Sequence, residues 1–594
     1  MIQAKGGGRM GDRRVLAGVF AAVLAVVAIG LMLKTDAAVA TVRDDTPESL
    51  RAEAFEAAQW AIASDAADAL AKVSARFAAG DDALGRLAEE RETLITRRDR
   101  LERELEGLYG LDGKEGVRRR AESRAEYNSV LERLAALDAE IAVRFPAYAE
   151  LTRPRALTVE ETQALLGPDE ALLLVLVNPE ATYVWGVSSE RIAWARAADL
   201  GDKAMSEAVE RLRASLTQAA AARGDEPDFD PMIFEGRPVP AYDRATAHRL
   251  YAELIQPVEA VFAGKSTLIT VVTGALTTLP LAVLMTEPST GLDTDRDALA
   301  GASWLIDRYA LASLPSVSSL KALRCHLVVA SAERHPGCPP GGVEPARPNA
   351  ERPGGIPLAA FGAPTLSGQV ARGSRGAEPA DLIMGDGRLA NVALLRALPD
   401  LPGSRAELAA LGARYPNSLV RTGAEATEDA VRRTDSVALS NARFVVFSTH
   451  GLMAGATVAE PGLVLTPPAT ATEADDGYLT ASEAAQLRLN AEFVVLSACN
   501  TAASDGRPGG EGLSGLARAF FYAGARSVLV SHWEVSDLAT TALITGTFAG
   551  LDAVPNDPAA RARALRGAML AVRSERRWGH PAYWAAFTLV GTPG

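Results

Sequence analysis

Two segments of the chain follow one pattern: Phe444-Val445-Val446-Phe447-Ser448-Thr449-His450-Gly451 and Phe493-Val494-Val495-Leu496-Ser497-Ala498-Cys499-Asn500. In each segment, four apolar residues precede two small ones, and a reactive side chain follows. Short β-branched and aromatic runs of this kind are typical of buried strands. Each segment therefore predicts a strand whose carboxyl end carries a reactive residue, His450 in the first and Cys499 in the second.

Similar apolar runs recur through residues 241–594, and helical patterns lie between many of them. The further predicted strands are Thr267–Val272, Leu327–Ala330, Leu358–Phe361 and Ser527–Val530, and the clearest helical patterns are Ser404–Arg414 and Leu513–Ala523. Alternation of strands and helices predicts an α/β domain, with a mostly parallel sheet flanked by helices on both faces.

Reactive groups gather at the carboxyl ends of strands in such a sheet. If the two segments form neighbouring strands, their ends lie about 5 Å apart, which is close enough for a Cys/His dyad. His450 would take the proton of the Cys499 thiol, and the thiolate would attack a carbonyl carbon. The N–H groups of Gly451 and Cys499 would form an oxyanion hole. Taken singly, each residue also has a structural interpretation, since Cys is often a small buried hydrophobe.

The composition excludes several other functions. The 594 residues carry a formal net charge of −13, which disfavours general nucleic-acid binding because that affinity depends on phosphate neutralisation. With six His and no Cys-x-x-Cys pair, we expect no structural zinc site. The chain also lacks a Gly-x-x-x-x-Gly-Lys-Ser/Thr phosphate loop, so a nucleotide-binding function is not supported.

Residues 1–45 have the pattern of an export or anchoring segment. Basic residues up to Arg14 precede an uncharged stretch from Val15 to Leu33, and 19 helical residues span about 28 Å, enough for a bilayer core. The segment is either a signal peptide cleaved after Ala38-Val39-Ala40 or an uncleaved transmembrane anchor. The remaining chain is expected outside the cytoplasm, in the periplasm or tethered to the cell membrane.

Residues 46–155 predict an α-helical hairpin with coiled-coil packing. Leu87, Leu94, Leu101 and Leu108 recur every seven residues, and a second stripe contains Tyr127, Leu131, Leu134, Leu137 and Ile141. A small β-containing connecting segment, residues 156–240, follows. Its two apolar runs, Ala171–Val177 and Ala181–Val187, predict paired strands.

The chain has three cysteines, Cys325, Cys338 and Cys499. In an oxidising compartment Cys325 and Cys338 could form a disulfide and leave Cys499 as the free thiol. The alternative is that both are unpaired buried thiols.

Further blocks of sequence have a recognisable order. They are Gly274-Ala275-Leu276 with Leu279-Pro280-Leu281, Tyr309–Leu320, Leu401–Leu411, Thr422–Thr427, Gly510-Glu511-Gly512-Leu513, Phe520–Ser527 and His580–Phe587. Together with the His450 and Cys499 segments, they resemble the CHAT domain family, a caspase-like and separase-like cysteine peptidase module. The resemblance covers residues 241–594. It implies a caspase-like sheet, His450 as general base, Cys499 as nucleophile, and no metal or organic cofactor.

This chain departs from the family pattern at two points. The tetratricopeptide repeats that often precede the module are not recognisable here, which puts the usual activation mechanism in doubt. Where relatives carry Leu-Trp-x-Val-Asp-Asp, this chain has His532-Trp533-Glu534-Val535-Ser536-Asp537. Asp537 and Glu511 are candidates for an acidic substrate pocket that prefers Lys or Arg, or else they cap a helix or a loop. His532 is interpreted as a pocket or surface residue rather than a second base.

These observations favour a cysteine endopeptidase that cleaves a protein or peptide substrate through Cys499 and His450. The alternative is a catalytically silent interaction module at the membrane, which binds a regulatory protein partner through the helical hairpin. Residues 15–33 would contact the membrane if the leader is retained, and no nucleic-acid partner is expected.

Overall fold

The computed structural model of the protein describes most of the chain from residue 46 onward. The described residues are 46–62, seven helical positions between 87 and 105, 113–144, 156–221, 241–326, 338, 355–367, 389–452, 461–472, 474–498, 501–502, 515–533, 536–554, 557 and 559–594. The expected leader, residues 1–45, and the expected strand Leu327–Ala330 lie outside them. Within the described ranges, no helix is long and apolar enough to cross a membrane.

An 11-stranded sheet forms the centre of the molecule, in the order β3-β2-β1-β4-β5-β14-β13-β12-β8-β6-β7. The strands are β1 (Glu170–Val177), β2 (Thr182–Ser188), β3 (Ile192–Ala197), β4 (Thr267–Val272), β5 (Ala310–Ser313), β6 (Ile356–Pro364), β7 (Leu419–Gly423), β8 (Ala442–Ser448), β12 (Phe493–Ser497), β13 (Ser527–Ser531) and β14 (Phe587–Gly591). A second, three-stranded sheet contains β9 (Gly451–Leu452), β10 (Gly462–Val464) and β11 (Tyr478–Thr480).

The large sheet is mostly parallel. Among its described strands, seven neighbouring pairs are parallel and three, β1–β2, β2–β3 and β13–β14, are antiparallel. Because β14 is antiparallel to β13 and parallel to β5, the strands from β7 to β13 run opposite to β14, β5, β4 and β1. The expected mixed α/β fold with a mostly parallel sheet is confirmed.

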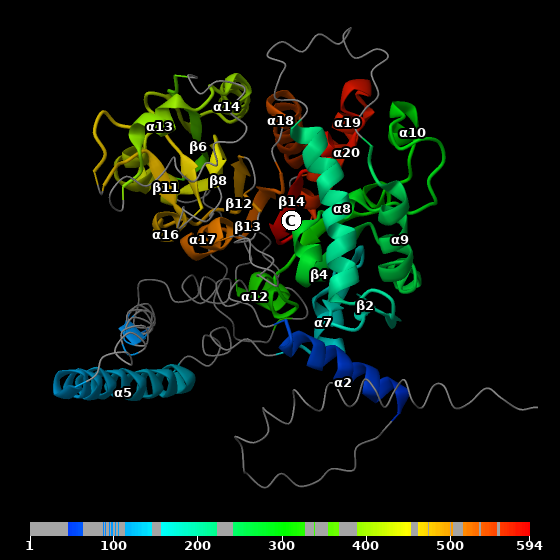
Figure 1. The fold of residues 1–594 in the computed structure, drawn as a ribbon, viewed down its shortest axis with the longest axis horizontal. Helices are drawn as coiled ribbons and strands as arrows, with labels where there is room; N and C mark the ends of the chain where they lie inside the picture. Colours follow the sequence, from blue (N-terminus) through cyan, green and yellow to red (C-terminus); the bar gives the residue numbers. More distant parts are fainter. Residues whose placement is uncertain are drawn as a thin grey trace, which may run out of the picture.

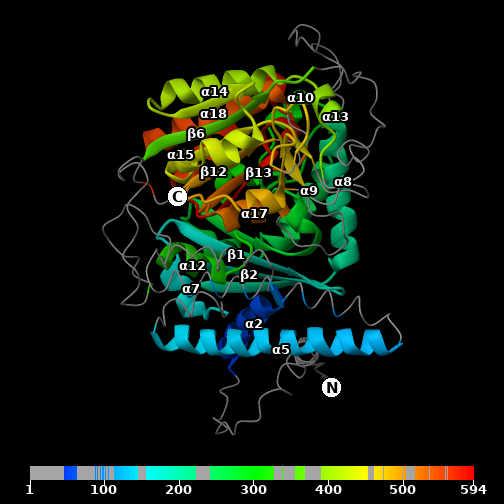
Figure 2. The ribbon, with the colours of Figure 1, turned by 90° about the vertical axis from the view of Figure 1, so that its left-hand side faces the viewer.

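Helices cover both faces of this sheet (Figures 1 and 2). Alternate residues of each strand point to opposite faces; for example, Phe444 and Val446 lie in one hydrophobic core, and Val445 and Phe447 in the other. The first core includes residues of α8 (Asp202–Ala221), α9 (Arg244–Leu254), α11 (Leu305–Arg308), α14 (Pro402–Arg414), α18 (Asp537–Ala553), α19 (Ala560–Ser574) and α20 (Pro581–Trp584). The second includes residues of α2 (Pro47–Trp60), α7 (Val159–Leu165), α12 (Ser318–His326), α15 (Ser436–Ser440), α16 (Ala481–Ala484) and α17 (Gly515–Ala523).

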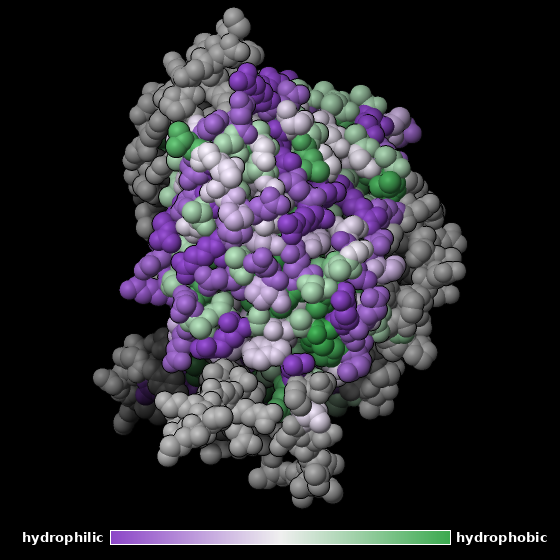
Figure 3. Space-filling view, turned by 90° about the vertical axis from the view of Figure 1, so that its right-hand side faces the viewer, coloured by the Kyte–Doolittle hydropathy of each residue, from purple (hydrophilic) through white to green (hydrophobic). Residues whose placement is uncertain are grey.

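Short helices complete the described structure. They are α10 (Arg296–Ala300), α13 (Val392–Ala397), the 3-10 turns η2 (Glu259–Phe262), η3 (Gly274–Thr278), η4 (Leu281–Val283) and η8 (Arg576–Trp578), and the π-helical turn η7 (Ala430–Thr434). On the side of the molecule where α9 and α10 lie, hydrophilic residues dominate and hydrophobic ones form small separate groups (Figure 3). Scattered apolar groups of this size are normal for a protein surface.

The segment expected as a connector, residues 156–240, supplies three strands of the large sheet. The predicted pair forms β1 and β2, which are antiparallel from Ala171↔Ser188 to Val177↔Thr182. β1 also pairs in parallel with β4, from Glu170↔Thr267 to Val175↔Val272, and Arg324 of α12 forms a buried ion pair with Glu170 at 2.6 Å. The sheet therefore continues across the expected boundary at residue 241.

The helical hairpin is antiparallel within the described residues. α5 (Gly113–Arg144) packs Val130 and Leu134 against Leu101. Arg97 donates to Glu126 at 2.9 Å, and Arg133 donates to Glu90 at 2.8 Å, so the partners run in opposite directions along the two helices. α5 and α2 lie at the end of the molecule nearest β1 and β2 (Figures 1 and 2). The expected stripe was wrong at Leu131, which is 39% exposed, because Val130 takes the inward position.

Cys325 and Cys338 form a disulfide with Cα atoms 5.3 Å apart. This resolves the alternative left open by the sequence in favour of pairing. Since the chain has three cysteines, Cys499 is the only one outside this bond.

Candidate functional site

His450 lies just beyond the carboxyl end of β8, and the backbone around it is held from two sides. The N–H of Thr449 donates to the carbonyl of Ser497 at 3.2 Å, which ties the end of β8 to the end of β12. The carbonyl of His450 accepts from the N–H of Val464 in β10 at 2.9 Å. The hydroxyl of Thr449 donates to the carbonyl of Val464. The position of His450 is therefore fixed relative to both sheets.

The imidazole of His450 has a defined orientation. Its Nε2 lies 2.8 Å from the carbonyl oxygen of Pro399, in the loop between α13 and α14. A carbonyl oxygen can only accept, so Nε2 carries the hydrogen. The neutral ring then presents Nδ1 as its proton acceptor, which is the arrangement a general base needs.

β8 and β12 are parallel neighbours, as the Cys/His hypothesis requires. They are in register from Phe493↔Phe444 to Ser497↔Ser448, so the two expected catalytic residues follow paired positions in the sequence. Cys499 and Asn500 themselves lie outside the described residues.

The residues on either side of Cys499 and Asn500 are both joined to Ser531, the last residue of β13. Its hydroxyl donates to the carbonyl of Ala498, and its N–H donates to Thr501 Oγ1 at 2.8 Å. Ala498, Thr501 and Ser531 are buried. These contacts fix both ends of the segment that contains Cys499.

Glu407 of α14 is a buried carboxyl group beneath the same strand ends. It is 1% exposed, and its Oε2 accepts from the hydroxyl of Ser497 at 3.0 Å. Burial raises the pKa of Glu407 to about 8, although the hydroxyls of Ser497 and Ser448 partly oppose this shift. Glu407 was not singled out from the sequence; the only signal was an acidic residue within the Leu401–Leu411 block.

Asp537, expected as a pocket residue, begins α18 and contacts the amino end of α14. Its carboxylate accepts from the N–H of Gly403 and also interacts with the N–H of Ser404. A Cβ on residue 403 would lie 2.4 Å from this carboxylate, so the contact requires glycine. Burial raises the pKa of Asp537, while these N–H groups and the nearby His450 oppose the shift. Asp537 therefore caps the amino end of α14, which was the alternative expectation, and it also lies within electrostatic reach of His450.

The other expected site residues are only partly described. Gly451 begins β9 opposite Leu463 of β10, directly after His450. Glu511 lies outside the described residues. Within the part of the chain that the structure describes, no group of three or more His, Cys, Asp or Glu side chains is placed to hold a metal ion.

His532 is not a surface residue, which was one of its two expected positions. It is 4% exposed, and its Nε2 lies 2.9 Å from Thr588 Oγ1 of β14. Burial and the nearby positive charge of Arg213 lower the pKa of His532 to about 3. The imidazole is therefore neutral at physiological pH and belongs to the packing between β13 and β14.

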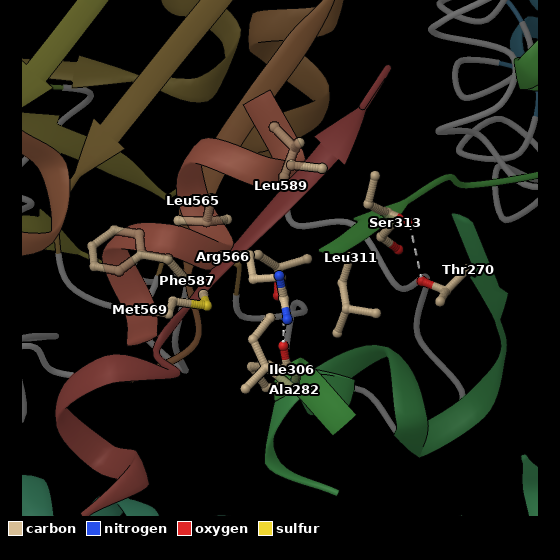
Figure 4. Close-up of a pocket in the computed structure, with 14 residues that line it drawn as sticks. Thr270, Ala282, Ile306, Leu311, Ser313, Leu565, Arg566, Met569, Phe587 and Leu589 are labelled. Carbon is tan, nitrogen blue, oxygen red and sulfur yellow. Dashed lines mark hydrogen bonds between the residues drawn. The ribbon is translucent and has the colours of Figure 1, made fainter. Parts of the chain in front are cut away.

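A small cavity lies elsewhere, between α19 and strands β4, β5 and β14 (Figure 4). Its volume of about 30 Å³ has room for one or two water molecules. Arg566 reaches into it, but its guanidinium donates to the carbonyls of Ile306 and Asp307 at 2.7 and 2.6 Å. The lining does not include His450, Glu407 or Asp537, so this cavity is separate from the strand ends described above.

Comparison with protein families gives a match to the CHAT domain over residues 244–592. Tetratricopeptide repeat protein 28 of Mus musculus is 40% identical over 114 residues, and that of Homo sapiens is 37% identical over the same length. Each match covers 19% of this chain and 4% of the relative.

Among solved structures, the match to the Saccharomyces cerevisiae separase–securin complex covers 84% of this chain and 37% of the matched chain, with a TM-score of 0.37 and 10% identity. The match to the complex of Porphyromonas gingivalis RgpB pro- and mature domains covers 65% of this chain and 77% of the matched chain, with a TM-score of 0.31 and 10% identity.

Proposed function

Since the chain belongs to the CHAT domain family, we propose that it is a cysteine endopeptidase that cleaves a protein substrate with Cys499 as nucleophile and His450 as base. The pairing of β8 with β12 carries this proposal. Ser448 and Ser497 are register partners, and His450 and Cys499 each follow two residues later in the sequence. Neighbouring strands lie about 4.8 Å apart, so an imidazole and a thiol at these positions are within reach of each other.

The chemistry follows from the orientation of His450. Nδ1 accepts the proton of the Cys499 thiol, and the thiolate attacks the scissile carbonyl carbon to form a tetrahedral intermediate. The N–H groups of Gly451 and Cys499 stabilise the oxyanion. The imidazolium then protonates the leaving amine as the C–N bond breaks. Water, activated by the neutral imidazole, hydrolyses the resulting thioester and regenerates the thiol.

We further propose that Asp537 and Glu511 favour a Lys or Arg residue before the scissile bond. Asp537 lies within electrostatic reach of His450. Its carboxylate already accepts from backbone N–H groups, so it would act on the substrate mainly through its charge.

We also propose that the protein is exported from the cytoplasm. The basic and apolar pattern of residues 1–45 and the Cys325–Cys338 disulfide both suit an oxidising compartment outside the cytoplasm. Mass spectrometry of the mature amino terminus tests this: a start at Thr41 supports a cleaved leader, and retained Met1 or Ile2 supports an anchor. Recovery of the folded protein with Cys325 and Cys338 reduced in the cytoplasm would contradict export.

Labelling with a thiol-reactive peptide electrophile that carries Arg at its reactive end tests the peptidase. Selective modification of Cys499 is expected, with a rate at least tenfold lower in His450→Ala. His248→Ala is the matched control, since its imidazole lies on α9 near the carbonyl of Met285. Labelling of Cys499 no faster than that of a denatured thiol would instead favour the alternative, an interaction module that binds a protein partner through the helical hairpin.

A further inference from the structure

Two strand ends and one helix meet at a single buried carboxyl group. Glu407 projects from α14 to the last residues of β8 and β12, Ser448 and Ser497, which are register partners. Ser497 Oγ donates to Glu407 Oε2 at 3.0 Å, and the Ser448 hydroxyl is close enough to lower the pKa of the same carboxyl. His450 and Cys499, which react in the proposed mechanism, lie two positions after Ser448 and Ser497.

Two buried atoms at this junction lack a hydrogen-bond partner within the described part of the chain: Glu407 Oε1 and Ser448 Oγ. A buried polar atom without a partner costs about 1–3 kcal/mol. One hydrogen bond between these two atoms removes both deficits: a neutral acid donates from Oε1 to Ser448 Oγ, and a carboxylate accepts at Oε1 from the Ser448 hydroxyl. In either form Oε2 accepts from Ser497.

We propose that Glu407 is a positioning residue that bridges Ser448 and Ser497 and thereby sets the spacing of His450 and Cys499. This inference rests on the proposed peptidase function for its catalytic consequence. Glu407 contacts neither substrate nor reacting atoms; it acts through the two strand ends. Removal of the carboxyl group takes away both arms of the bridge, so the dyad loses its spacing.

The surroundings of Glu407 favour the neutral form. Asp537 of α18 is the negative group that acts on it, and it raises the pKa of Glu407 further. β6 and β12 carry no charged residue. The remaining charged groups on the elements that pack here have other partners: Arg443 of β8 with Glu492, Arg421 of β7 with Asp435, Arg414 of α14 with Asp552 of α18, and Arg405 of α14 with Asp400.

The test compares Glu407→Gln with Glu407→Ala. Glutamine keeps one donor and one acceptor and has no ionisable proton, whereas alanine removes the bridge. The rate of Cys499 modification by the peptide electrophile is measured from pH 5 to 9.5 in both variants and in the wild type. Glu425→Gln, which removes an exposed carboxylate beyond β7, is the control for loss of charge.

Glu407→Gln is expected to react within threefold of the wild type over this pH range, because its amide can donate to Ser448 and accept from Ser497. Glu407→Ala is expected to be at least tenfold slower at every pH. A Glu407→Gln variant as slow as Glu407→Ala, or a Glu407→Ala variant as fast as the wild type, would overturn the inference.

A second readout keeps the inference testable apart from the peptidase. The amide of Thr449 bonds to Ser497 across the two strands, so its hydrogen exchange reports their spacing. Exchange at least tenfold faster in Glu407→Ala, with Glu407→Gln unchanged, supports the bridge even if wild-type Cys499 is unreactive and the peptidase proposal fails. Unchanged exchange in Glu407→Ala contradicts it. If Glu407→Ala does not fold, the Ser497→Ala variant takes its place in both measurements, with the same expected losses.

Discussion

At the scale of single residues, the site depends on close contacts between backbones, which glycine permits because it has no side chain. The clearest case is Gly362 of β6, the register partner of Ser448. A Cβ at this position would lie 2.0 Å from the carbonyl oxygen of Ser448, two residues before His450. Because that neighbour is backbone, the strands would have to separate to accept a side chain.

Gly362→Ala is therefore expected to lower the free energy of unfolding by about 2–3 kcal/mol and to slow the labelling of Cys499. Urea unfolding followed by circular dichroism measures the first effect. Gly567→Ala is the control, because a Cβ there meets no atom within 4 Å and alanine favours the helix by about 0.5–1 kcal/mol. Equal stabilities of Gly362→Ala and the wild type would show that the strand ends are not tightly packed.

The carboxylate of Asp537 carries a negative charge and also accepts a hydrogen bond from Gly403, and a substitution can separate these two roles. Asn at this position keeps an oxygen that can accept from Gly403 but removes the negative charge. Asp537→Asn is expected to leave the melting temperature within about 3 °C of the wild type and to lower the preference for Arg over an uncharged residue by about tenfold. Peptide substrates that differ only at this position measure the preference. An unchanged Arg preference would remove Asp537 from substrate recognition.

The residues of the site differed in how well the sequence could identify them. His450 and Gly451 follow a buried strand directly, so local pattern was enough to predict their place at the strand end. Glu407 and the Pro399 carbonyl reach the site from α14 and the loop before it, and no local pattern indicates which helix lies over which strand. His532 was misjudged because its burial depends on β14 and α8, which contribute Thr588 and Arg213.

At the scale of elements, α14 is held against the strand ends by groups that respond to pH. The pKa of Glu407 is raised from 4.5 to about 8. Between these values the folded protein keeps a proton that the unfolded chain releases, so the contribution of Glu407 to stability falls as pH rises through this window and levels off above it.

The difference in unfolding free energy between Glu407→Gln and the wild type isolates this effect. It is expected to grow in favour of the variant from pH 4.5 to 8, by an amount on the order of a few kcal/mol. Urea unfolding at four or five pH values measures it. A difference that stays constant over this range would mean that Glu407 is ionised in the folded protein at neutral pH.

Elements with strong patterns could be found from the sequence, and the edges of the sheet could not. The buried runs that form β8, β12 and β13 were predicted within one or two residues of their observed bounds. β3, β5 and β7 were missed. β7 is an edge strand with no fully buried residue, and the four-residue β5 alternates between buried and partly buried positions. Their pairing comes from neighbours that are distant in sequence.

At the scale of the whole molecule, one sheet joins residues that the sequence assigned to two regions. β1 lies between β2 and β4, and its residues Ala171 to Leu174 are fully buried. The sequence showed the β1–β2 pair, but not that β1 would also pair with β4, because parallel partners are set by tertiary packing rather than by a turn.

A shortened chain that begins at residue 241 is therefore expected to be defective. It leaves β4 as an unpaired apolar edge, which promotes association. We expect it to form oligomers or to melt at least about 10 °C below a chain that begins at residue 156 and keeps all 11 strands. Light scattering and thermal unfolding compare the two. A monomeric 241–594 chain with an unchanged melting temperature would show that β1–β3 are dispensable.

In the proposed reaction, the imidazole of His450 after β8 acts on the thiol of Cys499 after β12. The most direct measurement is the rate of Cys499 alkylation by iodoacetamide from pH 4 to 10, in the oxidised protein whose other two cysteines are paired. In the wild type, the rate is expected to rise with a midpoint below about pH 7, and in His450→Ala the midpoint is expected to return to about 8.5. A midpoint near 8.5 in both proteins would contradict activation of Cys499 by His450.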